Sequence, residues 1–221
     1  MNNALVHKRW TLRVFALLSA ALMLCLMPFS NSANAHGSTI NPASRNYQCY
    51  RDWGNDHLNP SMAQQDPMCW QAWQANPNAM WNWNGLYQNN VGGNHQGKVP
   101  NGTLCSGGHA ESGRYDALDT PGAWRTTSVG SSFTVQLYDQ ASHGADYFQV
   151  YVTRQGFNPD TERLGWDDLQ LVTTTGRYGP SQNYSIPVSG VTGRSGHHVV
   201  FTVWQASHMD QVYYLCSDVR F

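Results

Sequence analysis

HVVFTVWQASHMDQVYYLCSDV (residues 198–219) contains two runs, His198–Trp204 and Val212–Val219, that are rich in valine and aromatic side chains. Runs of this composition, separated by polar residues such as Asp210, predict two β-strands. Further short strands are predicted at Phe133–Leu137, Tyr147–Val152 and Leu169–Thr173, each bounded by Gly, Pro, Asn or Asp. Short strands at roughly regular spacing, with turn signals between them, are typical of a β-sandwich.

The first half of the chain differs in composition and in apolar pattern. From His36 to about Trp124 it is rich in Asn, Gly, Pro and Trp, and few apolar positions recur with a regular period. Only two short helices are predicted here, Met62–Ala72 and Ala79–Gln88. A loop-rich segment of this length is usually functional or stapled by disulfides. We therefore predict a mostly β, immunoglobulin- or fibronectin-III-like sandwich with a loop- and short-helix-rich insertion between its first strands.

The first 35 residues have the composition of a secretory signal peptide. Lys8, Arg9 and Arg13 precede an apolar run, and the segment ends in the small residues of Asn31–Ala35. A membrane anchor is the alternative, but a spanning helix needs about 20 apolar residues and this run is shorter and contains Pro28. We expect cleavage after Ala35. The mature protein would then be residues 36–221, a single domain that is secreted, has no membrane partner and is a monomer.

The charge balance excludes several classes of partner. The chain has 13 Lys and Arg and 14 Asp and Glu, and removal of the signal peptide leaves ten basic residues, of which only Lys98 is a lysine. A domain of this kind lacks the basic surface that nucleic acids or anionic membranes require. The abundance of Trp, Tyr, Asn and Gln instead suits a neutral, hydroxyl-rich partner, because flat rings stack on sugars and amides pair with hydroxyls.

Four cysteines remain after signal cleavage: Cys49, Cys69, Cys105 and Cys216. An even number in an oxidising compartment predicts two disulfides, for which three pairings are possible. We favour Cys49–Cys69, which closes a local loop, and Cys105–Cys216, which ties the last strand to the middle of the chain. Thiolate metal binding is disfavoured because the sequence contains no C-x-x-C pair.

Cleavage after Ala35 would make His36 the N-terminal residue. Its α-amino group and its own Nδ1 can then chelate one metal ion, and an α-amino group loses its proton readily because its pKa is roughly 7.7–8.0. One further imidazole would complete a set of three nitrogens. Planar nitrogen ligands favour copper.

His143 is the best candidate for this second imidazole. It lies in a turn between the predicted strands Phe133–Leu137 and Tyr147–Val152, and Gly144 beside it permits close approach of backbone or ligand. The paired histidines at 197 and 198 begin a strand, so their side chains point to opposite faces and cannot chelate together. We expect the remaining histidines to be solvated loop or strand residues: His57, His95, His109, His197, His198 and His208.

Taken in order, several segments make residues 36–221 resemble the bacterial lytic polysaccharide monooxygenases, auxiliary activity family 10, also called chitin-binding type 4 domains. The matching segments are His36-Gly37 with Pro42 and Arg45, Asn101–Ser106, Ala141–Gly144, Phe148–Thr153, Leu164–Leu169 and Tyr213–Val219. The resemblance implies that His36 and His143 bind one copper ion per chain.

The resemblance also assigns residues around the metal. Ala141 matches an alanine that crowds one axial face of the copper, and Tyr213 stands where many members have phenylalanine and some have tyrosine. Gln211 stands where relatives carry glutamate or glutamine, and an amide can donate a hydrogen bond to a bound oxygen species but cannot shuttle a proton as a carboxylate can. The alternative for Tyr213 and Gln211 is a strand that alternates its faces, on which positions i and i+2 share one side.

The insertion is where this family carries its substrate-contacting loop. We expect Trp81 or Tyr87 to present a ring to the polysaccharide, and Asn84 to lie close to the copper. Trp83 is a further candidate, although a tryptophan pair is more often buried than exposed. Asparagine in this loop accompanies cellulose-active members, some of which also act on chitin.

The function implied is oxidative cleavage, at C1 and/or C4, of β-1,4-linked crystalline cellulose, with chitin as a second candidate substrate. An external electron donor would reduce the copper. The alternative is a non-catalytic chitin- or cellulose-binding module, for which the pair His36 and His143 would have no use. A hydrolytic glycosidase needs two positioned carboxylates, and the neighbours Asp167 and Asp168 would point apart on a strand.

Overall fold

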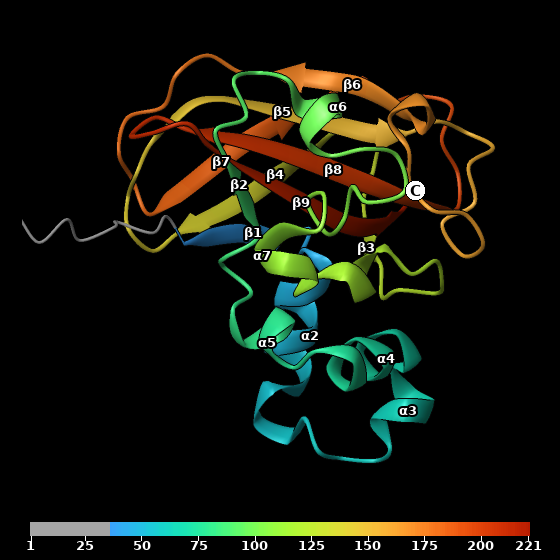
Figure 1. Ribbon diagram of the computed structural model, residues 1–221. Helices are drawn as coiled ribbons and strands as arrows, with labels where there is room; N and C mark the ends of the chain where they lie inside the picture. The colour runs from blue at the N-terminus through green and yellow to red at the C-terminus, as the bar shows by residue number, and fades with distance from the viewer. Residues whose placement is uncertain (1–35) are drawn as a thin grey trace, which may run out of the picture. The chain divides into compact units, whose positions relative to one another are not determined.

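The computed structural model describes residues 36–221, which form two β-sheets and an insertion of short helices (Figure 1). The predicted signal peptide lies outside the described residues. The smaller sheet is antiparallel, in the order β1-β4-β7, and its strands are β1 (Gly37–Asn41), β4 (Phe133–Asp139) and β7 (Asn183–Val188). None of the helices between residues 36 and 221 is long and apolar enough to cross a bilayer.

The larger sheet has the order β2-β9-β8-β5-β6, and β3 pairs with β9 in parallel. Its strands are β2 (Tyr87–Asn89), β3 (Thr127–Ser128), β5 (Ala145–Thr153), β6 (Leu169–Thr174), β8 (His197–Ala206) and β9 (Gln211–Arg220). Strands β8 and β9 are therefore neighbours, with Trp204 opposite Tyr213. The prediction of a mostly β sandwich is confirmed. Strands β1, β2, β3 and β7 were not predicted.

The space between the sheets is filled by side chains that alternate along the strands. On β4, Val135 and Leu137 are buried, and they belong to the same apolar cluster as Phe148 and Val150 of β5 and Trp204 of β8. Alternation of this kind buries one face of each strand against the opposite sheet.

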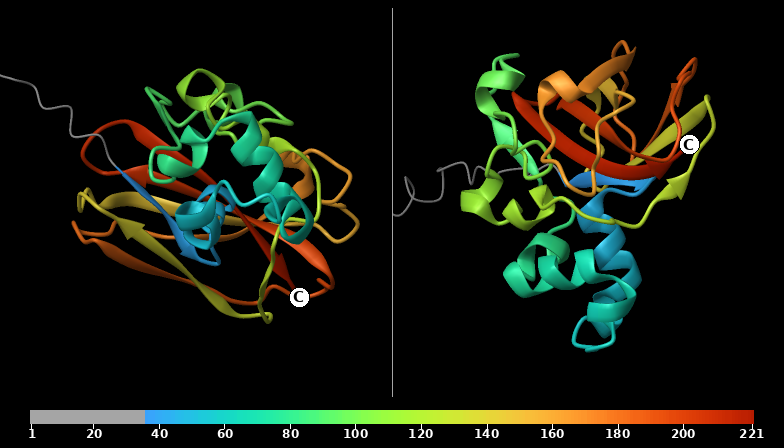
Figure 2. Two further views of the ribbon diagram at one scale, coloured as in Figure 1. Left: turned by 90° about the horizontal axis from the view of Figure 1, so that it is seen from below. Right: turned by 90° about the vertical axis from the view of Figure 1, so that its right-hand side faces the viewer.

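The insertion runs from the end of β1 to β4, as predicted, and the helices of residues 45–81, α2 to α5, form a lobe that extends below both sheets in the view of Figure 1 (Figures 1 and 2). It has its own apolar cluster, which includes Met80, Leu86 and Leu104 and packs against Phe201 and Tyr214 of the larger sheet. Its helices are α2 (Arg45–Trp53), η1 (Gly54–Asp56), α3 (Met62–Gln65), α4 (Pro67–Ala75), α5 (Asn78–Trp81), α6 (His95–Lys98), α7 (Ala110–Gly113) and η2 (Asp116–Asp119).

Both helix predictions need correction. The predicted helix Met62–Ala72 is two helices, because residues before a proline avoid helical geometry and Asp66 precedes Pro67. Asp66 instead caps α4 by accepting a hydrogen bond from the backbone N–H of Cys69. The predicted helix Ala79–Gln88 ends at Trp81, and its last part pairs with β9 as strand β2. Helix α2 was not predicted.

The two disulfides are those favoured from the sequence. Cys49–Cys69 joins α2 to α4 within the insertion, and the two residues are 20 positions apart. Cys105–Cys216 joins the insertion to β9 across 111 positions.

A buried ion-pair network lies where β9 ends and β8 begins. The Asp218 carboxylate accepts two hydrogen bonds from the Arg45 guanidinium, at 2.7 and 3.0 Å, and contacts Nε2 of His197 at 2.8 Å. The other ring nitrogen of His197 lies 2.9 Å from Asp160. Burial alone would raise the pKa of Asp218, but the charge of Arg45 and the hydrogen bond from His197 lower it. Burial opposes the charge of His197, but Asp218 and Asp160 together raise its pKa above 6.5.

Removal of the long-range disulfide should cost more stability than removal of the local one. In the chain-entropy account, closing a loop of 20 residues contributes about 3 kcal/mol and a loop of 111 residues about 5 kcal/mol. Denaturant unfolding of Cys49→Ala/Cys69→Ala and Cys105→Ala/Cys216→Ala measures both. A larger loss for the first pair would contradict the expectation.

The charge on His197 should stabilise the fold at low pH. Since the pKa of His197 is raised on folding, its contribution is full below pH 6.5 and is lost as the pH rises through the folded pKa. We expect His197→Gln to cost about 2 kcal/mol at pH 6 and progressively less at higher pH. Thermal unfolding between pH 5.5 and 9 checks this, with the exposed His109→Gln as control. A difference from wild type that does not shrink with pH would be inconsistent with the proposed charge effect.

Candidate functional site

His36 is held between two segments that are far apart in the sequence. It directly precedes β1, in which Gly37 pairs with Asp139 at the end of β4. The carbonyl of His36 accepts a hydrogen bond from the backbone N–H of Gln140 at 2.8 Å, and the N–H of Gly37 donates to the carbonyl of Asn84 at 2.9 Å. The side-chain amide of Asn84 also donates to Oε1 of Gln140. Asn84 therefore lies beside His36, on the insertion side.

Glycine is required at position 37. A Cβ there would lie 2.7 Å from the ring of Trp204 and 2.7 Å from the carbonyl of Tyr138, closer than side-chain atoms pack. The start of β1 thus lies directly on the indole of Trp204. This contact sets the distance between the backbone at His36 and the apolar core.

His143 lies in the turn between β4 and β5, and its position depends on Asp139. The Asp139 carboxylate is completely buried. It accepts hydrogen bonds from the backbone N–H groups of His143, at 2.6 Å, and Ala141, at 3.1 Å, and it lies 3.0 Å from Nδ1 of His143. A carboxylate can only accept, so Nδ1 of His143 carries the proton and Nε2 keeps its lone pair for a metal ion.

The turn around His143 adopts backbone conformations that leave little freedom. Ser142 and Gly144 both have positive φ angles, 56° and 78°. A Cβ on Gly144 would meet the Ser207 hydroxyl and the carbonyl of Tyr178, as expected for a close backbone approach. The Ser207 hydroxyl also donates to the carbonyl of His143 at 2.8 Å. Ala141 is exposed in this turn.

Tyr213 and Gln211 lie under this surface and are buried. The ring of Tyr213 stacks on Trp204 with centroids 4.4 Å apart, and its hydroxyl donates to Oε1 of Gln211 at 3.3 Å. The two side chains therefore share one face of β9, as their spacing predicted. The Gln211 amide in turn donates to the side chain of Asn89 at 3.1 Å. Burial raises the pKa of Tyr213 well above its ordinary value, so the phenol stays neutral.

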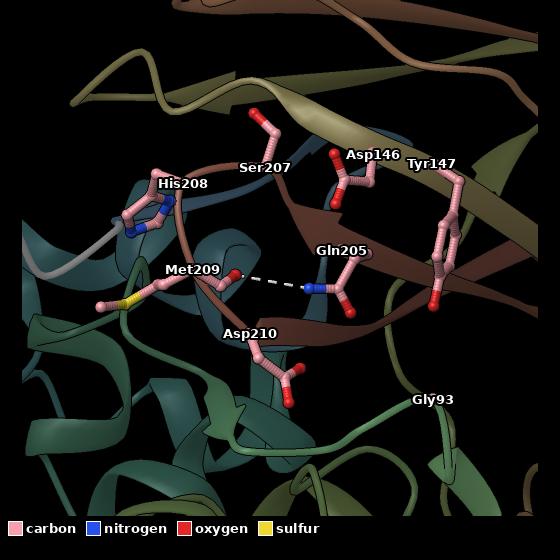
Figure 3. A pocket seen from close by; sticks show the side chains of 8 residues that line it. All are labelled: Gly93, Asp146, Tyr147, Gln205, Ser207, His208, Met209 and Asp210. Carbon is pink, nitrogen blue, oxygen red and sulfur yellow. Dashed lines mark hydrogen bonds between the residues drawn. The ribbon is translucent and has the colours of Figure 1, made fainter.

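His208 is a site neighbour that sequence reasoning missed. It lies on the turn between β8 and β9 (Figure 3), and its ring centroid is 4.1 Å from that of His143. We expected a solvated loop residue, and no local pattern marks this contact. Asp139 and Gln140 were also missed, because in the sequence they are only polar residues that follow a predicted strand.

The other histidines lie elsewhere. His57 packs on Trp73 and Trp81 in the insertion, His95 bonds two tyrosines, and His109 pairs with Asp116. His197 and His198 bond different partners, Asp218 and Thr153, which agrees with the expectation that they cannot chelate together. The expectation of a solvated residue is wrong for His198, because it is buried in β8.

The predicted aromatic residues differ in exposure. Trp81 is 43% exposed, whereas Trp83 is only 8% exposed. Trp83 was a substrate-binding candidate, and its ring packs against Tyr47 and Tyr50, so little of it is available to a substrate. Tyr87 is half-buried against Tyr213, with ring centroids 5.4 Å apart.

The donor set fits copper if the chain begins at His36. Among residues 36–221 no group of three or more His, Cys, Asp or Glu side chains could hold a metal ion. Two imidazoles at this edge therefore need a third nitrogen, which the free amine of an N-terminal His36 would supply. A small set of nitrogen ligands with open positions is the kind of site that copper prefers.

A pair of carboxylates for glycoside hydrolysis is not formed by Asp167 and Asp168. They lie in a short 3-10 helix, η3 (Trp166–Asp168), and not on a strand. Asp168 is occupied in accepting a hydrogen bond from the backbone N–H of Gly165 at 2.8 Å.

Comparison with known proteins identifies close relatives. The family model described as lytic polysaccharide mono-oxygenase, cellulose-degrading, matches residues 36–219. A lytic polysaccharide monooxygenase from Kitasatospora papulosa has a crystal structure that is 69% identical, with a TM-score of 0.83, and the match covers 84% of this chain and 98% of that one. The cellulose-active relative CelS2, solved in complex with copper, is 31% identical, with a TM-score of 0.71, and the match covers 84% of this chain and 98% of that one.

A curated relative is longer than this chain. The lytic cellulose monooxygenase of Streptomyces ambofaciens is 34% identical over 223 residues, which cover 94% of this chain but only 59% of the relative. The chain thus spans somewhat more than half the length of this curated relative.

Asp139→Asn should allow the neutral imidazole of His143 to adopt either tautomer. An amide of the same size cannot accept from all three donors that face Asp139, so the ring proton should no longer be fixed on Nδ1. Nitrogen NMR of the metal-free protein reads the tautomer directly. Copper affinity should fall about 10–100-fold, as when the outer partner of a ligating histidine is lost. Asp116→Asn, beside the exposed His109, is the matched control and should change neither quantity. An unchanged tautomer and affinity in Asp139→Asn would refute this role.

Proposed function

Because the chain belongs to the cellulose-degrading lytic polysaccharide mono-oxygenase family, we propose that it oxidatively cleaves β-1,4-linked polysaccharide at one copper ion held by His36 and His143. The observation that carries this proposal is the Asp139 carboxylate. It fixes His143 with Nε2 free, at the same edge of the sandwich where Gly37 and Gln140 hold His36. The substrate that we infer is crystalline cellulose, with chitin as a second candidate, and attack at C1 and/or C4.

The ligands would be the amine and Nδ1 of His36 and Nε2 of His143. When bound, copper supplies one-electron redox chemistry and activates an oxidant toward the C–H bonds of a sugar. The residues of the chain contribute orientation. Asp139 sets the ring of His143, and Gln140 and Asn84 hold the peptide group between His36 and Gly37.

The groups under the site keep its interior neutral and closed. The buried Tyr213 phenol is bonded to Gln211, so it offers no acidic group near the metal. Gln211 is bonded to Asn89 and provides an amide, not a carboxylate, at this position. We infer that these groups limit water access and can donate hydrogen bonds, whereas proton delivery comes from other groups or solvent.

The substrate would lie across the surface that carries the site. Trp81 is the exposed ring of the insertion, and its position is fixed by edge contacts with Tyr50, His57 and Trp73 at 5.1–6.0 Å. A ring held in this way can stack on a sugar face at little entropic cost. Tyr87 and Asn84 are the further contacts that we propose, and Ala141 lies exposed in the turn beside His143.

The proposal includes the route by which the site is completed. We propose that residues 1–35 are a signal peptide, that cleavage follows Ala35 and that residues 36–221 act outside the cell as a monomeric single domain. An external electron donor would supply the electrons that the bound copper requires. The remaining alternative is a non-catalytic cellulose- or chitin-binding module, which would need Trp81 but not the arrangement of Asp139 and His143.

One Cu(II) should bind per mature chain, and the free amine should be essential. Leaving one extra residue before His36 should abolish tight binding, because the chelating amine is converted to an amide. Calorimetry on the extended protein, before and after proteolytic removal of that residue, provides a matched control. Equally tight binding in the extended form would rule out the proposed ligand set.

Catalysis and adhesion should be separable. His143→Ala should abolish oxidised products from cellulose and chitin, measured by mass spectrometry with copper and ascorbate, while binding to the solid is largely retained. Trp81→Ala should weaken binding to the solid by about 1–2 kcal/mol, or roughly 5–30-fold, and leave Cu(II) affinity unchanged. If His143→Ala released oxidised products at the wild-type rate, the binding-module alternative would be favoured.

A further inference from the structure

Two adjoining hollows lie beside the site. The first, about 380 Å³, is lined by the β8–β9 turn with Tyr147 and Gln205 (Figure 3). The second, about 320 Å³, is lined by the segment leading into α6 with Gln149, Tyr151 and Trp166. Gly93 lines both hollows, and the Tyr147 hydroxyl of the first contacts Nε2 of His95 of the second at 2.9 Å. We call the two hollows together the β5 groove.

The floor of the β5 groove is one face of strand β5. Tyr147, Gln149 and Tyr151 alternate along β5 with the buried residues Phe148 and Val150, so their side chains point away from the sandwich core. At roughly 3.3 Å per residue, the step from Tyr147 to Tyr151 is about 13 Å. This length exceeds that of one pyranose ring, so the floor of the groove is long enough for more than one sugar of an extended chain.

The walls of the groove are rigid. Both ring nitrogens of His95 are bonded, one to the hydroxyl of Tyr214 and the other to that of Tyr147, each at 2.9 Å. This bridge holds the segment around Gly93 against the sheet. At the other end, the indole N–H of Trp166 donates to the carbonyl of Val99 at 2.7 Å. Because its polar atom is already satisfied, Trp166 presents only its apolar ring to the groove.

The chemistry of the lining indicates a neutral ligand. No lysine or arginine lines either hollow, whereas Asp146 and Asp210 line the first. An anionic ligand would be repelled, and Asp210 already accepts a hydrogen bond from the N–H of Gly92 at 2.8 Å. The oxygen of Gln149 accepts a hydrogen bond from the Tyr151 hydroxyl at 3.0 Å, and that of Asn94 from the N–H of Gly97 at 3.1 Å, so each amide keeps its NH₂ donors for neighbouring hydroxyls. The rings of Tyr151 and Trp166 pack edge-to-face beside them, with centroids 5.7 Å apart. Rings and amides without cations match a sugar chain.

We propose that the β5 groove is a second carbohydrate site, which binds a single soluble β-1,4-linked glucan chain. The choice of sugar rests on the proposed function. The groove is continuous with the metal edge through His208, whose ring contacts that of His143 and which lines the first hollow. It differs from the surface around Trp81, which would bind the solid. A chain freed from the solid can therefore remain on the protein after the reaction.

The test is a titration of the mature protein with cellohexaose, both copper-loaded and copper-free. In NMR spectra, the indole N–H of Trp166 and the side-chain amides of Gln149 and Asn94 should shift saturably and equally in both forms. Maltohexaose, an α-linked chain of different shape, is the control ligand. Shifts confined to Trp81 and the residues around His36, the absence of saturable shifts, or equal shifts with maltohexaose would each overturn the proposal.

Gln149→Ala should weaken cellohexaose binding at least about fivefold, the equivalent of one hydrogen bond. Gln136→Ala, an exposed glutamine of β4 outside the groove, is the matched control and should bind as the wild type does. Equal affinity of Gln149→Ala and wild type would overturn the proposal. The assay needs no copper and no oxidised product, so failure of the proposed function would appear separately, in the copper and product measurements. If Gln149→Ala does not fold, the NMR titration of the wild-type protein with cellohexaose still tests the proposal.

Discussion

The buried carboxylate of Asp139 is the contact on which the site depends. It ends β4, pairs in register with Gly37 and binds both the backbone and the ring of His143. Its backbone pairing joins β1 to β4, segments more than a hundred residues apart, and its side chain fixes the turn that follows β4. Burial of a carboxylate is costly unless its acceptors are satisfied, and here every partner is a group that must be positioned for function. Stability and geometry are thus set by the same three hydrogen bonds.

The two apolar clusters support different parts of the site. The cluster between the sheets supports the site on its inner side, because the ring of Trp204 packs against both Gly37 and Tyr213. The cluster of the insertion includes Leu86, next to β2, and packs against Tyr50, which stacks on Trp83. Strand β2 pairs with β9 at the edge of the larger sheet, and Asn84, between Trp83 and β2, lies beside His36. An exposed ring such as Trp81 and a buried ring such as Trp83 therefore have different roles although only one residue separates them.

Much of this arrangement could be predicted from sequence. Valine-rich alternation identified β4, β5, β6, β8 and β9, and the ordered motifs singled out His36 and His143 as candidates, which the structure places at one edge of the sandwich. Strand β7 was missed because Pro187 argues against a strand, and it is tolerated there only since β7 lies at a sheet edge. Asp139 and His208 were missed for another reason. Their roles arise from contacts between turns, and neither residue type nor spacing encodes such contacts.

The position of β9 also bears on how the protein folds. This strand pairs with β2, β3 and β8, and Cys216 joins it to Cys105 across 111 positions. Segments that are far apart in the sequence must therefore meet before the larger sheet is complete. Because pairing across such distances is slow, we expect the larger sheet to close late in folding, and the Cys105–Cys216 disulfide to hold it closed afterwards.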